Sequence, residues 1–233
     1  MDIKTLTPDD LHLVVAHIPQ DVRKLMTTFP LILGGGFIRS IIAGEEVQDI
    51  DLFGGNIDYL NSHADQLTRS RESDNTRKHH TPNAITVVSL GRMTVQFITR
   101  WLFDDPVILM QSFDFSVCRA AIMYREGKWT SCIDPDFYSD LAARRLVYRY
   151  PQRDEDAGGS MLRVRKFLMR GYNIQPHSLA GVIARLTSSI VARGGEVQYA
   201  EDIEKRLVEV DPVLLIDGVD LVDEHSLDKL KGE

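Results

Sequence analysis

The sequence predicts an α+β protein, in which a mixed β-sheet with flanking helices comes first and a small helical domain follows. A strand, a glycine turn, a helix and a second strand can be read from residues 31–53. Two β-rich runs, 84–90 and 94–99, flank a short glycine-containing turn, as expected for a hairpin. From about Asp136 onward, apolar residues recur with helical spacing instead.

The division between the two parts is expected near residue 150. The segment Gln152–Gly159 is polar and ends in a Gly-Gly pair, which favours a flexible joint. We therefore expect a first domain of residues 1–150 and a helical domain of residues 151–233. Helical spacing on both sides of the joint predicts helices over Asp140–Leu146, Ser160–Arg170, Ser178–Ala192 and Tyr199–Val210.

Local signals predict the amino-terminal elements. Thr7 can cap a helix that begins at Pro8 and carries two acids in its first turn. A helix over Phe37–Ala43 is expected to end at Gly44. The other predicted elements are a helix around Gln20–Phe29 and strands over Leu31–Leu33 and Val47–Phe53.

The middle of the first domain is harder to assign. The segment Asn61–Asn83 has few large apolar side chains, so we expect it to start as a helix and end as a mobile loop. His79 and His80 within it suggest a polar loop rather than a metal site. A short helix or a turn is expected around Asp105–Met110, whereas Asp114–Ile122 fits a strand or a helix.

The bulk composition limits how the protein can bind nucleic acid. A net charge of -7 over 233 residues argues against nucleic-acid binding through the whole surface. Arginines between Arg144 and Arg170 would allow a directed contact, although a solvated helix surface has the same composition.

Cysteine use and hydropathy bound the compartment. Cys118 and Cys132 are too few for a disulfide framework, so we expect two reduced, packed thiols. No apolar run approaches the ~20 residues of a membrane span. The start Met1-Asp2-Ile3-Lys4 lacks the features of a secretory signal. We therefore expect a cytoplasmic protein with no membrane partner.

A glycine turn followed by two acids is the strongest chemical signal. Gly34-Gly35-Gly36 separates a buried strand from a helix, so we expect its amides to face outward, where they could hold a phosphate. Asp49 and Asp51 are two residues apart on the next strand and point to the same side. Mg²⁺ or Mn²⁺ would offset their repulsion, since Mg²⁺ prefers one or two carboxylates plus phosphate oxygens.

These residues resemble the polymerase-beta-like nucleotidyltransferase superfamily, most closely its class II branch of CCA-adding enzymes and bacterial poly(A) polymerases. The family's Gly-Gly-x-Val-Arg-Asp turn is similar to residues 35–40, and its Asp-x-Asp-Leu strand to residues 49–52. Two later family elements resemble residues 112–120 and 162–172. The resemblance therefore covers roughly residues 30–175, and it implies a nucleotidyltransferase head followed by a neck-like helical domain.

The resemblance also implies an activity, namely transfer of an NMP from an NTP such as ATP to a hydroxyl acceptor. An RNA or tRNA 3′ end is one such acceptor. Asp49 and Asp51 would hold the metal, and Asp114 would contact the nucleotide sugar or act as a supplementary acid. The remaining implied nucleotide-binding residues are Gly35, Gly36, Arg39, Arg163 and Arg165.

Three positions depart from the family pattern. Ser40 stands where the turn has Asp, and Gln96 stands where many members place a third carboxylate. In the helix that reads the base, Ser160 occupies the place of Arg. These departures favour an alternative, a non-catalytic or regulatory nucleotidyltransferase-fold protein that serves as a toxin–antitoxin-type or inhibitor-type partner. A third possibility is transfer of NMP to a protein or small molecule.

Overall fold

The computed structural model describes residues 3–151, 158–192 and 203. The chain forms two compact units, Met1–Ala142 and Ala143–Glu233, which are described one at a time. The expected division at residue 150 stays a prediction. Most of the predicted joint, and all of the predicted helix Tyr199–Val210 except Ile203, lie outside the described residues.

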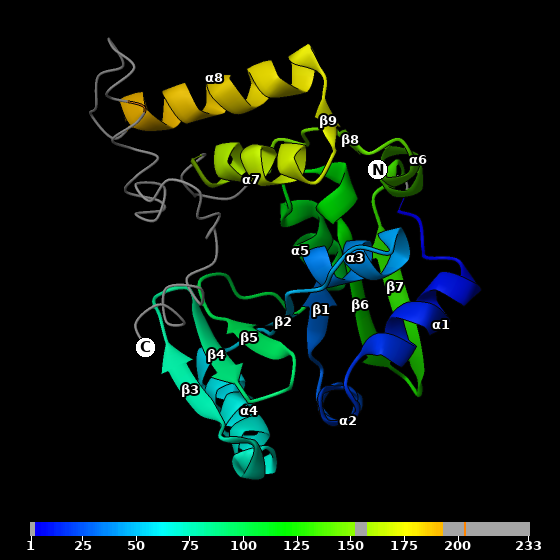
Figure 1. The fold of residues 1–233 in the computed structure, drawn as a ribbon, viewed down its shortest axis with the longest axis vertical. Coiled ribbons are helices and arrows are strands. Elements are labelled where there is room, and N and C mark those ends of the chain that lie inside the picture. The colour runs from blue at the N-terminus through cyan, green and yellow to red at the C-terminus, as the bar shows by residue number, and fades with distance from the viewer. Residues whose placement is uncertain (1–2, 152–157, 193–202, 204–233) are drawn as a thin grey trace. The chain divides into compact units, whose positions relative to one another are not determined.

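One mixed sheet organises the first unit, as predicted. Among the described residues its strand order is β3-β4-β5-β2-β1-β6-β7 (Figure 1). β2 and β5 run parallel, and the other neighbouring strands run antiparallel. The strands are β1 (Ile32–Gly34), β2 (Asp49–Phe53), β3 (Arg77–His80), β4 (Ala84–Val88), β5 (Thr94–Ile98), β6 (Ala120–Arg125) and β7 (Lys128–Ile133).

The start of α1 and the end of α3 lie at the signals read from the sequence. Thr7 accepts a hydrogen bond from the Asp10 amide, and Gly44 ends α3 in the left-handed conformation with φ 66°. The predicted short helix near Asp105 also forms, with the Asp105 side chain as its cap. The helices are α1 (Pro8–His17), α2 (Gln20–Thr28), α3 (Gly36–Ala43), α4 (Ile57–Ser70), α5 (Pro106–Ser112) and α6 (Phe137–Ala142), with the 3-10 turns η1 (Glu72–Asp74) and η2 (Ser116–Cys118).

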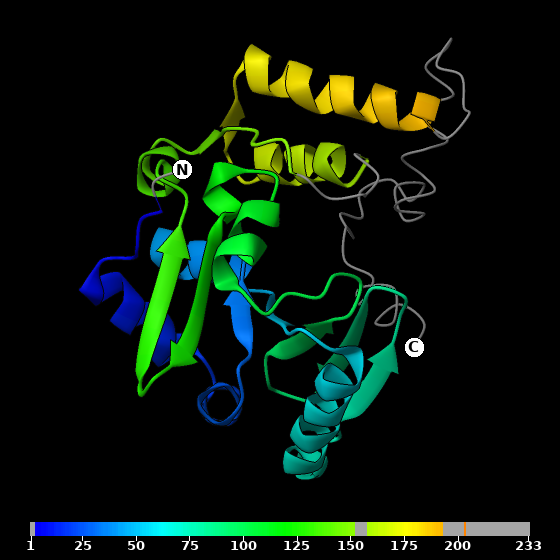
Figure 2. The ribbon, with the colours of Figure 1, turned by 180° about the vertical axis from the view of Figure 1, so that it is seen from behind.

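Helix α4 covers one face of strands β3, β4 and β5 (Figure 2). Ile50 lies opposite Val95 and Leu52 opposite Phe97, and all four side chains are fully buried. From β3, Lys78 reaches Asp65 and Asn61 of α4. Because side chains alternate along a strand, residues 49 and 51 point to the opposite face, away from α4.

A second part of the core lies between β1, β6, β7 and α5. It is built from seven buried residues: Ile32, Phe53, Leu109, Met110, Ala121, Met123 and Cys132. Both cysteines are buried and free, as predicted. Burial raises the pKa of the Cys132 thiol to about 12.

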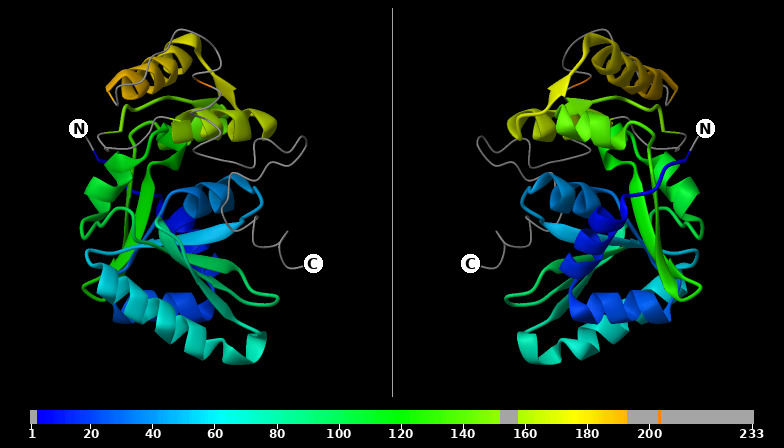
Figure 3. Two further views of the ribbon diagram at one scale, coloured as in Figure 1. Left: turned by 90° about the vertical axis from the view of Figure 1, so that its left-hand side faces the viewer. Right: turned by 90° about the vertical axis from the view of Figure 1, so that its right-hand side faces the viewer.

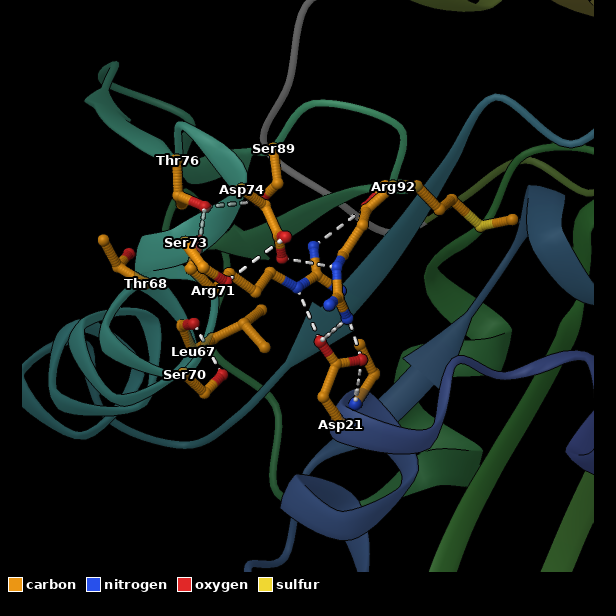
Figure 4. Close-up of polar contacts among 12 residues, drawn as sticks. Asp21, Leu67, Thr68, Ser70, Arg71, Ser73, Asp74, Thr76, Ser89 and Arg92 are labelled. Carbon is orange, nitrogen blue, oxygen red and sulfur yellow. Dashed lines mark hydrogen bonds and ion pairs between the residues drawn. The ribbon is translucent and has the colours of Figure 1, made fainter.

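A buried arginine ties together α2, the end of α4 and the β4–β5 turn (Figure 4). Arg71 is fully buried and donates to Asp21 through Nε at 2.6 Å and Nη2 at 3.3 Å. Its Nη1 donates to the Met93 carbonyl at 3.1 Å. Arg92 pairs with Asp21 and Asp74 at 3.4 and 2.7 Å. Burial works to raise the pKa of Asp21, but the hydrogen bond and charge of Arg71 outweigh it, and the pKa lies below its ordinary value.

An aromatic cluster lies between α2 and α4. The His63 ring packs against Phe29 at 4.0 Å and edge-on to Tyr59 at 4.1 Å, measured between ring centroids. His63 is 4% exposed. This burial lowers the pKa of His63, because the protonated ring would lose its hydration.

The expectation of a mobile loop at the end of Asn61–Asn83 is wrong. α4 runs to Ser70, and residues 77–80 form the edge strand β3, with Lys78 opposite Val87 and His79 opposite Thr86. An edge strand needs no apolar face, and charged residues there discourage pairing with other chains. Polar composition alone therefore could not separate this strand from a loop.

Two other expectations change in the structure. The predicted helix Asp140–Leu146 is wrong in its second half, because α6 ends at Ala142 and residues 145–146 form strand β8. For Asp114–Ile122, where the pattern fitted a strand or a helix, the structure has η2 followed by β6.

The second unit contains the predicted helices as α7 (Gly158–Met169) and α8 (Pro176–Ala192). The two helices lie side by side (Figure 3). β8 (Arg145–Leu146) and β9 (Asn173–Ile174) form a short parallel pair in the same unit. None of the described helices has the length and apolar character that a bilayer span requires.

Candidate nucleotide and metal site

The glycine turn connects β1 to α3 as the sequence predicts. The added Cβ of an alanine at Gly34 would lie 3.1 Å from both the Leu109 and Phe113 side chains. Gly35 has φ 76° and ψ -127°, a conformation that side chains disfavour. The turn therefore needs glycine both for its backbone and for the close approach of Phe113.

The amides of the turn divide into two groups. The expectation that all of them face outward is wrong for Gly35, whose N–H donates to the Ala120 carbonyl at 2.9 Å and extends the β1–β6 pairing. Gly36 is only half-buried and begins α3. The first amides of a helix lack intrahelical acceptors and carry the positive end of its dipole, so the first turn of α3 can donate to an anion.

The acid pair lies beside this turn. β1 runs antiparallel to β2 with Leu33 opposite Leu52, so the end of β1 that enters the glycine turn adjoins Asp51. Asp49 and Asp51 are half-buried and share the face of β2 that points away from α4, whereas Ile50 between them is fully buried. The structure thus brings together the glycine turn and the two carboxylates predicted from the sequence.

Gln96 belongs to the same cluster. In the parallel pairing of β2 and β5 it lies opposite Asp51. Its Nε2 donates to Asp49 Oδ2 at 2.9 Å, and the residue is 8% exposed. The amide that replaces an expected third carboxylate is therefore in direct contact with one acid of the pair.

Arg39 points into the protein beneath the turn. The residue is 5% exposed, its Nη2 donates to Ser40 Oγ at 2.9 Å, and its Nε lies 3.4 Å from Glu45 Oε2. Both terminal nitrogens lie within 4 Å of where a Cβ on Gly36 would be, so a positive charge lies next to the turn. Ser40 thus keeps contact with the guanidinium, and Glu45 supplies a nearby carboxylate.

The remaining predicted residues are placed as follows. Asp114 is 1% exposed in the short segment between α5 and η2. Arg163 and Arg165 lie on α7 of the second unit, the first half-buried and the second exposed. Their roles toward a nucleotide stay predictions.

The donor set suits a hard divalent cation. Two carboxylates on one face, with a neutral amide beside them, fit the one or two carboxylates that Mg²⁺ usually takes from protein. In the described part of the chain, no group of three or more His, Cys, Asp or Glu side chains could hold a metal ion. Any cation here would therefore need further oxygen ligands, such as substrate phosphates.

Reasoning from sequence missed Glu45 and Phe113 as parts of the site. Glu45 follows the helix-ending Gly44, and its amide donates back to the Ser40 carbonyl at 2.8 Å, which keeps its side chain near Arg39. An acid directly after a helix-ending glycine was the available signal. Phe113 carried no local signal, because its contact with Gly34 joins residues far apart in the chain.

The fold is shared with known structures. The structure is similar to that of the Thermotoga maritima CCA-adding enzyme complexed with tRNA, with a TM-score of 0.57 and 16% identity, over 90% of this chain and 52% of that one. It is also similar to a CCA-adding enzyme with ATP, with a TM-score of 0.54 and 19% identity, over 92% of this chain and 52% of the other. The chain therefore has a nucleotidyltransferase fold, which confirms the resemblance seen in the sequence.

The family is more specific than the fold class. Residues 9–144 match the model of the Gabija anti-defense 2 family, and the chain belongs to this family. A relative named Gabija anti-defense 2, from Bacillus phage SPbetaL7, is 24% identical over 162 residues. The alignment covers 68% of this chain and 38% of the relative, so the chain spans well under half of that protein's length.

Proposed function

We propose that this chain is a metal-dependent nucleotidyltransferase that moves an NMP from an NTP to a hydroxyl acceptor, and that this reaction serves to counter Gabija defence. The single observation that carries the proposal is the pair Asp49 and Asp51 on one face of β2, directly beside the glycine turn. A site that had lost its activity would have no physical need for two close carboxylates. The family name supports the anti-defence role.

The proposed roles follow from the placement of each group. The amides at the start of α3 would hold triphosphate oxygens, and the charge of Arg39 beneath Gly36 would favour the anion there. Asp49 and Asp51 would hold Mg²⁺ or Mn²⁺. When bound, such an ion would neutralise phosphate charge and lower the pKa of the acceptor hydroxyl. Asp114 would orient the nucleotide, and Arg163 and Arg165 remain proposed nucleotide-binding residues.

The acceptor is proposed by class. CCA-adding enzymes of similar fold were solved with tRNA or ATP, which supports an NTP donor and an RNA acceptor such as a tRNA 3′ end. The family membership supports a second acceptor class, a protein of the Gabija defence. The cytoplasm, where both would be available, remains the expected compartment.

Labelled NTPs test the proposal directly. The protein is incubated with each α-labelled NTP, Mg²⁺ or Mn²⁺, and in turn bulk tRNA, total RNA and lysate protein from cells that carry Gabija. Asp49→Asn and Asp51→Asn are expected to lower transfer by at least 100-fold. Asp58→Asn, which removes an exposed acid at the start of α4, is the matched control and should leave transfer unchanged. Absence of transfer to every acceptor would refute the catalytic proposal.

A non-catalytic role is the second candidate, and the neutral amide of Gln96 in place of the expected third carboxylate favours it. A neutral amide cannot supply the charge of a third carboxylate. In this case the chain would bind an NTP and act on a Gabija protein by contact alone. NTP binding without transfer, together with protection from Gabija that survives Asp49→Asn, would support this candidate over the enzyme.

A further inference from the structure

We propose that Gln96 is a positioning residue for Asp49, holding this carboxylate beside Asp51 in the arrangement that receives a divalent cation. The role of Gln96 rests on the metal site proposed above. It assigns a function to the one residue of the cluster that departs from the expected carboxylate.

The contact geometry connects Gln96 to both acids. The backbone of Gln96 lies opposite Asp51 in the β2–β5 register, and its side chain reaches along the sheet to Asp49 Oδ2 at 2.9 Å. The three side chains therefore share one face of two adjacent parallel strands. A shift of one residue in this register would turn Gln96 toward α4 and break the contact.

The surroundings hold Gln96 in place. Val95 and Phe97 on either side of it are fully buried, and Thr86, its partner on β4, is also fully buried. Gln96 itself is 8% exposed. Little side-chain freedom remains at this position, so the hydrogen bond to Asp49 is preformed and costs little entropy to keep.

The chemistry of an amide suits this task. An ionised carboxylate has about four lone-pair sites, and the bond from Gln96 takes up only one of them on Asp49. The amide donates without bringing a charge, unlike Arg or Lys, which would repel the ion. Outer partners of this kind orient metal ligands, and their loss typically costs about 10- to 100-fold in metal affinity.

The test is a titration of the protein with Mn²⁺ alone, in which EPR measures the bound ion. Thermal melts in EDTA verify that each variant is folded. Gln96→Leu removes the donor, and Gln96→Asn keeps an amide that is one methylene too short. Both should weaken Mn²⁺ binding by about 10- to 100-fold. Gln96→Glu adds a third carboxylate at the same reach, so it should tighten Mn²⁺ binding and lower the melting temperature in EDTA.

The opposite signs separate positioning from simple structural support. If Gln96 only packed the sheet, Gln96→Glu would weaken binding as Gln96→Leu does, and the proposal would be overturned. Gln66→Leu and Gln66→Glu are the matched controls, because Gln66 is exposed on α4, which covers the other face of the sheet. They should leave Mn²⁺ binding within twofold of wild type.

The outcomes also separate this role from the proposed function. If both Gln96→Leu and Gln96→Asn bind Mn²⁺ with an affinity within threefold of wild type, the role of Gln96 is overturned but the metal site is not. No Mn²⁺ binding by the folded wild type overturns the metal site itself. Should Gln96→Leu fail to fold, Gln96→Asn and Gln96→Glu still decide the question.

Discussion

Removing the charge of Asp21 is expected to destabilise the first unit more than any change to its other partner, Arg92. Asp21→Asn keeps the side-chain shape but leaves the guanidinium of Arg71, which is 0% exposed, with only neutral partners. Breaking a buried ion pair from one side costs about 3–5 kcal/mol. The Asp21 side chain is itself 18% exposed, and nearby water tempers the loss, so we expect about 3 kcal/mol.

The matched variants give an order of effects. Arg92→Met removes a pair whose arginine side chain is 44% exposed, and such pairs contribute about 0–1 kcal/mol. Arg71→Met removes the buried positive charge together with its hydrogen bonds to Asp21. Combined with Asp21→Asn, it should therefore cost less than the sum of the two single changes.

Urea unfolding followed by tryptophan fluorescence measures these costs. Both tryptophans of the chain, Trp101 and Trp129, lie in the unit Met1–Ala142, so the signal reports this unit. The pKa of Asp21 is lowered in the folded state, so its stabilisation is present above about pH 4. It is lost as the pH falls through the lowered value. An Asp21→Asn cost no larger than that of Arg92→Met would refute the reasoning.

Three further outcomes are expected. Gly35→Ala should lower the free energy of unfolding by about 1–3 kcal/mol and weaken ATP binding, because Gly35 has φ 76° and the Phe113 ring lies close to it. Gly44→Ala, where an added Cβ meets open space, should leave ATP binding unchanged. An unchanged melting temperature and ATP affinity for Gly35→Ala would contradict this expectation. Because the pKa of His63 is lowered, its contribution to stability is retained above about pH 6.5 and falls as the pH drops below that value. Between about pH 7.5 and pH 5, the melting temperature should therefore fall less in His63→Phe than in wild type. Cys132, whose pKa is raised to about 12, should resist iodoacetamide at pH 8 until urea unfolds the chain, and rapid labelling of the native protein would disprove its burial.

Local signals were sufficient where one element or its boundary was concerned. Thr7 caps a helix and Gly44 ends one as predicted, because capping depends on groups within one turn of the chain. The shared face of Asp49 and Asp51 followed from the period of a strand, which needs no tertiary information.

Polar residues at sheet edges and in the core could not be placed from the sequence. Arg71 belonged to a polar segment expected to pass from a helix into a mobile loop, yet it is fully buried, because Asp21, 50 residues earlier, compensates its charge. Arg39 was expected among the nucleotide-binding residues, and its Nε lies 3.4 Å from Glu45 Oε2, a partner that was not predicted from the sequence. Such pairings depend on which elements pack together.

The sequence by itself determined the glycine turn, the acid pair and several helix ends, because strand period, glycine conformation and helix caps act over a few residues. Only the tertiary structure decided what those groups contact. The parallel pairing of β2 with β5 brings Gln96 to Asp49, which lies 47 residues earlier in the chain. The Gly35 amide, which was expected to be available to a phosphate, donates to the Ala120 carbonyl of β6 instead. A hydrogen bond between strands depends on register, and register is set by burial of the whole sheet.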